Sequence, residues 1–212
     1  MENFDRKKHW DNIYQHKQIN EVSWYQPTPT TSLEFVKRVD LPKTLKIIDI
    51  GGGDSYFVDH LLNLGYTDIT VLDISANAIE KAKQRLGSKA EQVKWVIADA
   101  ATFEPNETYD FWHDRAAFHF LTDSKEIEHY VSIIKRYINP GGYFVVGTFS
   151  EQGPLKCSGI EIKQYSEAAL TSLLNDCFDK EFCFTLDHKT PFNTVQNFIF
   201  CSFRRRETLK VL

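Results

Sequence analysis

A glycine-rich segment near the first quarter of the chain constrains the fold more than any other feature. Residues 47–55 read IIDIGGGDS, so an apolar, β-branched run ends in a carboxylate and three consecutive glycines. A helical pattern follows from Tyr56 to Leu64, and a second apolar run ends at Asp73. A strand, tight turn and helix followed by a strand with an acidic end is typical of nucleotide-like ligand sites. The sequence therefore predicts that this turn binds an adenosine-containing cofactor.

Strand-like runs alternate with helical patterns over the first two thirds of the chain. The predicted strands are residues 45–50, 69–72, 93–98, 110–113 and 143–148. The clearest predicted helices are residues 56–64, 76–86 and 125–138, and Ser75 and Asp123 are N-cap candidates for the second and third. This alternation indicates a parallel sheet that helices cover on both faces.

The pattern changes after Thr148. A predicted helix over residues 166–177 precedes two strand-like runs, residues 181–187 and 196–204, which a short turn region joins. Strands with a short connection pair antiparallel. We therefore expect a Rossmann-like three-layer αβα sandwich whose seven-stranded sheet has six parallel strands and a reversed last strand.

The length of 212 residues fits a single domain. Within it we expect an N-terminal helical arm (1–40), a cofactor-binding core (45–148) and a C-terminal part with a substrate-side loop, a helix and the antiparallel pair (149–212).

The composition argues against several classes of protein. A formal charge of −4, from 25 Lys and Arg against 29 Asp and Glu, leaves no broad basic surface, so we expect no nucleic-acid partner. No run approaches the roughly 18 to 20 apolar residues of a membrane span, and residues 1–19 are too polar for a signal peptide. We therefore expect no membrane contact and a cytoplasmic location. Four cysteines without a CxxC pair predict neither a disulfide nor a metal site.

The glycine turn itself distinguishes between cofactors. Nicotinamide-binding turns have a third glycine where this chain has Tyr56, and no Gly-Lys-Ser/Thr motif follows the turn. Asp49 at the strand end would repel a pyrophosphate but can accept a hydrogen bond from an ammonium group. A nicotinamide oxidoreductase on the same sheet is an alternative, and Tyr56 argues against it.

Two further carboxylates complete the predicted site. Asp73 ends the second strand, where it can accept hydrogen bonds from both hydroxyls of a ribose. Asp99 follows the third strand, where an adenine amino group would lie. Ligand sites in open α/β sheets lie at the carboxyl ends of the strands, so these acids should converge. S-adenosylmethionine carries an ammonium, a ribose and an adenine and is the predicted cofactor, and we also expect Ile74 to contact it.

Between Lys46 and Thr148 the chain resembles the class I S-adenosylmethionine-dependent methyltransferases. Their motifs correspond to Asp49 with Gly51, Gly52 and Gly53, to the ribose acid Asp73, to the adenine-contacting pair Asp99-Ala100 and to the turn at residues 139–142. Relatives often have Cys in place of Gly52 and Thr-Gly in place of Asp54-Ser55, and these departures leave the carboxylates and the neighbouring glycines in place. The resemblance implies methyl transfer from S-adenosylmethionine.

A narrower resemblance is carried by residues 21–26, 112–121 and 153–159. These segments are similar to a group of small, mostly bacterial methyltransferases without an assigned substrate. The acceptor is therefore open. The missing basic face and the lack of an added recognition domain favour a small molecule, with a protein lysine as an alternative. A non-catalytic subunit that binds S-adenosylmethionine or S-adenosylhomocysteine is a second alternative.

Four polar side chains crowd around the end of the fourth predicted strand: His113, Asp114, Arg115 and His119. The resemblance implies that the transferred methyl group points toward this strand end. We expect His113 to line the cofactor pocket, and Asp114, Arg115 or His119 to position the acceptor or take its proton. In the structural alternative, Asp114 and Arg115 form an ion pair and His119 lies in the core. Methyl transfer needs little acid–base help, because alignment with the sulfonium supplies most of the rate.

Tyr25 lies in a Trp24-Tyr25-Gln26 segment between the first predicted helix and Pro27. An arm of this kind can fold over a cofactor crevice, so we predict that Tyr25 contacts the cofactor or closes the site. Alternatively, both rings only dock the arm onto the sheet.

Overall fold

The computed structural model describes residues 4–40 and 42–207, and its main sheet has seven strands in the order β3-β2-β1-β4-β5-β9-β8. Strand β9 pairs antiparallel with both β5 and β8, so β8 runs in the same direction as the first five strands. The predicted αβα architecture with one reversed strand is confirmed. The strands of this sheet are β1 (Lys46–Ile50), β2 (Asp68–Asp73), β3 (Val93–Ile97), β4 (Tyr109–Arg115), β5 (Ile138–Phe149), β8 (Phe178–Lys189) and β9 (Val195–Arg205).

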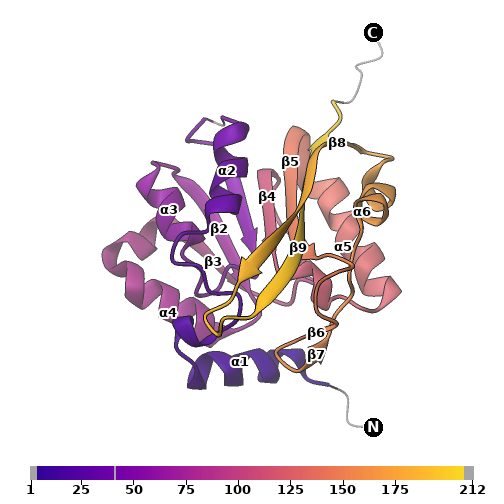
Figure 1. Ribbon diagram of the computed structural model, residues 1–212. Coiled ribbons are helices and arrows are strands. Elements are labelled where there is room, and N and C mark those ends of the chain that lie inside the picture. The colour runs from indigo at the N-terminus through magenta and orange to yellow at the C-terminus, as the bar shows by residue number, and fades with distance from the viewer. Residues whose placement is uncertain (1–3, 41, 208–212) are drawn as a thin grey trace.

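Helices cover both faces of the sheet (Figure 1). One face packs against α2 (Thr30–Arg38), α3 (Phe57–Asn63) and α4 (Ala76–Leu86), and the other against α5 (Ser124–Tyr137) and α6 (Glu167–Leu174). Because both faces are covered, neighbouring residues of one strand enter different cores: Ile47 joins the α2–α4 side and Ile48 the α5–α6 side. None of the helices in the described residues is long and apolar enough to cross a membrane.

The N-terminal helix α1 (Arg6–His16) lies across the end of the sheet rather than on a face (Figure 1). Asp11 ties it to the segment after β2, because its carboxylate accepts a 2.7 Å hydrogen bond from the Ser75 hydroxyl. The remaining short elements are η1 (Ile19–Glu21), η2 (Gly87–Gln92), η3 (Phe118–Phe120), β6 (Lys156–Cys157) and β7 (Ile160–Glu161). The arm thus covers the carboxyl ends of the parallel strands, where the predicted site lies.

The two predicted N-caps are confirmed. The Ser75 side chain accepts the Ala78 N–H at the start of α4, and Asp123 caps α5 in the same way. Residues 139–142, predicted as a turn, instead lie inside β5. Register slips there, because Tyr109 pairs with Ile138 whereas Phe111 pairs with Tyr143. The four residues therefore form an irregularity within a longer strand.

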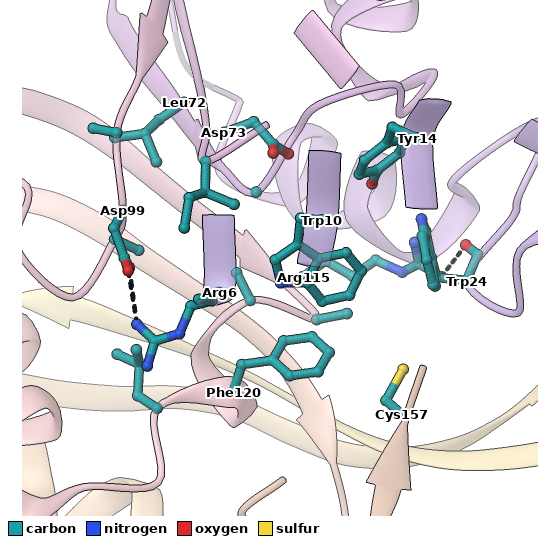
Figure 2. A pocket seen from close by; sticks show the side chains of 17 residues that line it. Arg6, Trp10, Tyr14, Trp24, Leu72, Asp73, Asp99, Arg115, Phe120 and Cys157 are labelled. Atoms are coloured by element: carbon teal, nitrogen blue, oxygen red, sulfur yellow. Dashed lines mark hydrogen bonds and ion pairs between the residues drawn. The ribbon is translucent and has the colours of Figure 1, made fainter. Parts of the chain in front are cut away.

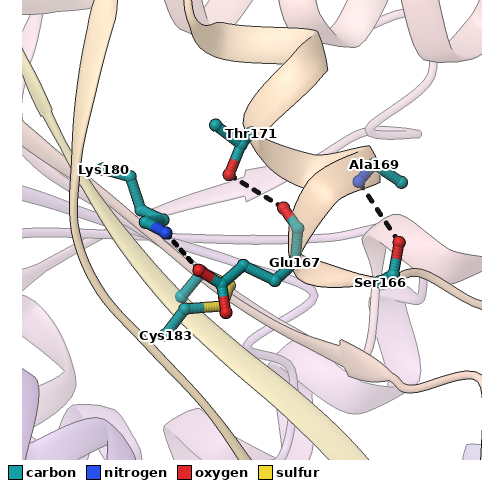
Figure 3. Close-up of a disulfide and its surroundings, with 7 residues drawn as sticks. Ser166, Glu167, Ala169, Thr171, Lys180 and Cys183 are labelled. Atoms are coloured by element: carbon teal, nitrogen blue, oxygen red, sulfur yellow. Dashed lines mark hydrogen bonds and ion pairs between the residues drawn. A yellow bond between two sulfur atoms is a disulfide. The ribbon is translucent and has the colours of Figure 1, made fainter.

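The expectation that the chain has no disulfide is wrong: Cys183 and Cys201 are bonded (Figure 3). The two residues are register partners on β8 and β9, and their Cα atoms lie 4.1 Å apart. Directly opposed antiparallel positions bring side chains this close, and the pairing depends on strand register rather than on cysteine spacing. The other two cysteines, Cys157 and Cys177, are free thiols.

Candidate functional site

An open cavity lies where the carboxyl ends of β1 to β4 meet α1. Helix α1 contributes Arg6, Trp10 and Tyr14 to its wall (Figure 2). A smaller cavity is lined in part by Asp49 and His113. Four residues line both cavities, namely Tyr14, Trp24, Gly51 and Arg115. The two cavities therefore adjoin one another at these four residues.

The three glycines bring the backbone turn against the acidic side chains. Gly51 has a φ of +66°, and a Cβ atom there would come within 2.8 Å of the Ala117 methyl group. A Cβ at Gly52 would overlap the Asp49 carboxylate, and one at Gly53 would overlap that of Asp73. The turn therefore requires glycine both for its conformation and for the close approach to the two carboxylates.

Asp73 ends β2 and lines the larger cavity, as the sequence predicts (Figure 2). Its Oδ1 atom accepts a 2.8 Å hydrogen bond from the Ser75 N–H. Burial raises the pKa of Asp73 to about 7, and the nearby charges of Asp49 and Asp11 act in the same direction. Ile74 and Ala100, also predicted contacts, line the same cavity.

Asp49 is part of a buried hydrogen-bonded chain beside the smaller cavity. Its Oδ1 atom lies 2.6 Å from His113 Nδ1, and His113 Nε2 lies 2.8 Å from the Ser32 hydroxyl. Both ring nitrogens of His113 are thus engaged, which fixes the ring and orients the carboxylate. Asp49 and His113 both line the smaller cavity.

Asp99 lines the larger cavity but already has a cationic partner from α1. Arg6 Nη1 lies 3.0 and 2.9 Å from the two Asp99 oxygens. Its Nη2 atom lies 3.0 and 2.8 Å from the two oxygens of Glu126 on α5. Arg6 therefore joins the arm to β3 and α5 across the rim of the site. Sequence reasoning missed this residue, although Arg6, Trp10 and Tyr14 recur at the four-residue spacing of one helix face.

Arg115 ends β4 and lines both cavities. Its Nη2 atom donates a 3.0 Å hydrogen bond to the Trp24 carbonyl (Figure 2). Burial lowers the pKa of Arg115 to about 10, although the negative charge of Asp49 acts against that shift. The ion pair with Asp114 considered from the sequence does not form, because consecutive strand residues point to opposite faces.

Asp114 and His119 lie away from both cavities. The Asp114 carboxylate accepts hydrogen bonds from the Ala117 and Phe118 N–H groups at 3.1 and 3.0 Å and from the Tyr130 hydroxyl at 2.5 Å. His119 stacks on Phe149 at 4.5 Å. Among the described residues neither ring nitrogen of His119 has a hydrogen-bond partner, and burial lowers its pKa to about 3. The structure therefore does not bring these two predicted catalytic residues to the cavity wall.

The arm places Trp24, rather than Tyr25, at the site. Trp24 lines both cavities, whereas the Tyr25 ring lies against Tyr56 at 6.4 Å and is not part of either wall. Trp10 and Phe120, whose ring centroids are 5.0 Å apart, extend the aromatic wall. Within residues 4–40 and 42–207, no group of three His, Cys, Asp or Glu side chains is arranged to hold a metal ion.

The comparisons with known proteins match this chain to methyltransferases. Residues 47–142 match a family described as a methyltransferase domain. The malonyl-[acyl-carrier protein] O-methyltransferase 2 of Ilyobacter polytropus is 30% identical over 114 residues, which cover 53% of this chain and 42% of that protein. The eEF1A lysine and N-terminal methyltransferase of Mus musculus is 26% identical over 160 residues, covering 72% of this chain and 23% of that protein. The chain thus spans less than half the length of these two curated relatives.

The fold has close counterparts among solved structures. The N-methyltransferase NodS from Bradyrhizobium japonicum WM9, crystallised with S-adenosyl-L-homocysteine, superposes with a TM-score of 0.69 at 16% identity, covering 96% of this chain and all of that one. At this identity the likeness concerns the fold.

Proposed function

We propose that the chain is a class I S-adenosylmethionine-dependent methyltransferase and that it transfers a methyl group from S-adenosylmethionine to a small-molecule acceptor. One observation carries the proposal. The carboxylates of Asp49 and Asp73 flank a glycine turn that has no room for side chains, and they line two adjoining cavities. This set of groups matches a ligand with an ammonium at one end and a ribose in the middle.

The residues present fit the donor at each of its parts. Asp49, oriented by His113, would accept from the ammonium group, and Asp73 from the ribose hydroxyls. Ile74 and Ala100 offer an apolar surface for the adenine, beside the Asp99 carboxylate. When bound, S-adenosylmethionine supplies an electrophilic methyl group on a positively charged sulfur.

The protein contributes mainly alignment and exclusion of water. Trp10, Tyr14, Trp24 and Phe120 form an aromatic wall that α1 and the following segment hold over the sheet. Aromatic faces attract cations, so this wall suits a sulfonium, and a dry, aligned site supplies much of the rate of methyl transfer. A site roofed by a helix also suits a small acceptor better than a protein side chain.

Calorimetry with purified protein tests the proposal. We expect S-adenosylmethionine and S-adenosylhomocysteine to bind one site and NAD not to bind. Asp73→Ala should weaken binding of both by roughly 1 to 3 kcal/mol, because buried polar groups of the ligand lose their partner. Binding of NAD, or unchanged affinity in a folded Asp73→Ala protein, would contradict the proposal.

Transfer itself needs a second assay. Donor labelled in the methyl group is incubated with a metabolite extract and, separately, with a protein extract. We expect label in the small-molecule fraction only. Donor binding without transfer to either fraction would indicate a non-catalytic binding subunit, and transfer to protein alone would indicate a protein methyltransferase.

A further inference from the structure

Arg115 is a partly buried arginine without an acidic partner in the described part of the chain. Two other partly buried arginines are fully engaged: Arg6 pairs with Asp99 and Glu126, and Arg85 with Asp54 and Asp59. Arg115 has no carboxylate within ion-pair distance among residues 4–40 and 42–207, and its one side-chain hydrogen bond there goes to the Trp24 carbonyl. Burying a cation without a counter-charge is costly, so its position calls for an anion.

The position of Arg115 within the site identifies what it faces. This step rests on the proposed function, in which Asp49 holds the ammonium end and Asp73 the ribose. The sulfur of the donor joins these two parts, so it must lie near the residues that line both cavities. Arg115 is one of those four residues, together with Gly51, Tyr14 and Trp24. Its guanidinium therefore lies beside the place from which an acceptor approaches the methyl group.

In the proposed complex, the sulfonium of the donor and Arg115 place two positive charges at this point, whereas the donor's own carboxylate lies at its ammonium end, beside Asp49. A sulfonium and a guanidinium would lie close together in a half-buried site, where like charges repel strongly. Asp49, which lines the smaller cavity with Arg115, is hydrogen-bonded to His113, and Asp99 in the larger cavity is paired with Arg6. A negative group of the acceptor would offset one of these two positive charges. The planar guanidinium matches a carboxylate, which it can bind through two parallel hydrogen bonds.

We propose that Arg115 binds a carboxylate of the methyl acceptor, and that the apolar body of the acceptor packs against Trp10 and Phe120. Both rings line the larger cavity and lie in edge-to-face contact with one another. Arg115 is thereby the specificity-determining residue for an aromatic or otherwise apolar carboxylic acid.

The test compares acids with their neutral amides. Benzoate against benzamide, and indole-3-acetate against indole-3-acetamide, are titrated into protein saturated with S-adenosylhomocysteine. We expect each acid to bind at least about tenfold more tightly than its amide. In Arg115→Gln the acid and amide should bind within about twofold of each other, and Arg115→Lys should keep part of the preference because it keeps the charge but not the planar fork.

Arg85→Gln is the matched control. Arg85 is also a partly buried arginine, but it lines neither cavity and is paired with two carboxylates, so its loss should leave the preference for acids in place. A preference that survives in Arg115→Gln, or equal or absent binding of acids and amides in the unmodified protein, overturns the inference.

A second measurement separates the acceptor from the donor. S-adenosylhomocysteine and its decarboxylated analogue are titrated into the unmodified protein and Arg115→Gln. We expect the substitution to change the two affinities equally and by less than about threefold. A selective loss for S-adenosylhomocysteine would assign Arg115 to the carboxylate of the donor instead and overturn the inference. Failure of S-adenosylhomocysteine to bind the unmodified protein would contradict the proposed function itself.

Discussion

Asp73 has a pKa that should make ligand binding depend on pH near neutrality. Burial raises this pKa to about 7, so the carboxyl gains a proton as the pH falls below that value. Ribose hydroxyls donate to the ionised form, because a protonated carboxyl has lost part of its capacity to accept. We expect the affinity for S-adenosylhomocysteine to fall between pH 8 and pH 6, measured by calorimetry. Asp73→Asn should bind S-adenosylhomocysteine weakly and without this pH dependence. An unchanged pH profile in the variant would show that another group causes the dependence.

The Asp73 carboxyl should lower the free energy of unfolding at high pH. Its folded pKa of about 7 lies above the ordinary value of 3.8, so its stabilising contribution is present below pH 3.8 and is lost as the pH rises through 7. Asp73→Asn should therefore be more stable than the unmodified, ligand-free protein at pH 8, and this advantage should shrink toward pH 5. Denaturant unfolding at both values provides the measurement.

Asp114 is expected to act in folding rather than in catalysis. Its carboxylate accepts two backbone N–H groups and the Tyr130 hydroxyl, and it lines neither cavity. Asp114→Ala would leave these buried donors without partners and should lower the free energy of unfolding by about 2 to 4 kcal/mol. Tyr130→Phe, which removes only one of the three hydrogen-bond donors, should lower the free energy of unfolding by less. The affinity of folded Asp114→Ala for S-adenosylhomocysteine should stay within a few-fold of that of the unmodified protein. A loss of affinity without a loss of stability would indicate that Asp114 contributes to the ligand site.

At the scale of elements, Arg6 at the start of α1 helps to hold this helix over the site, in addition to the Asp11–Ser75 hydrogen bond. Arg6 joins Asp99 after β3 to Glu126 on α5, with charge-assisted hydrogen bonds to both oxygens of each carboxylate. Arg6→Ala should loosen α1, so its amide hydrogens should exchange faster and S-adenosylhomocysteine should dissociate faster. Lys7→Ala is the control, because the Lys7–Asp11 pair lies within the helix and Lys7 is exposed. Equal exchange rates in the two variants would contradict a role for Arg6 in closing the site.

The elements themselves were predictable because their signals are local. The Ser75 cap lies next to the helix it begins, and the Asp73 carboxylate ends its own strand, so both could be placed from neighbouring residues. The opposite directions of Asp114 and Arg115 also follow from the two-residue period of a strand. The Arg6–Asp99 contact was not predictable in this way, because it joins residues 93 positions apart. The same holds for the choice of Trp24 over Tyr25, which depends on how the arm meets the sheet.

At the scale of the whole molecule, the disulfide is inconsistent with the expected cytoplasmic location. Cys183–Cys201 joins β8 to β9, and β8 is the edge strand of the sheet. Disulfides persist in oxidising compartments and are rare in the cytosol, where thiols stay reduced. The redox state of this pair therefore bears on both the fold and the location.

Thiol titration of the denatured protein, without reductant, decides between these states. With the bond formed, Cys157 and Cys177 are the two free thiols, so two should react rather than all four cysteines. The bond closes a loop of 18 residues, and its reduction should lower the free energy of unfolding by about 3 kcal/mol. Cys183→Ser should show the same loss without reductant, whereas Cys177→Ser should keep the sensitivity to reductant. Four reactive thiols in protein purified without reductant would show that the two cysteines are neighbours but not bonded, as a cytoplasmic protein requires.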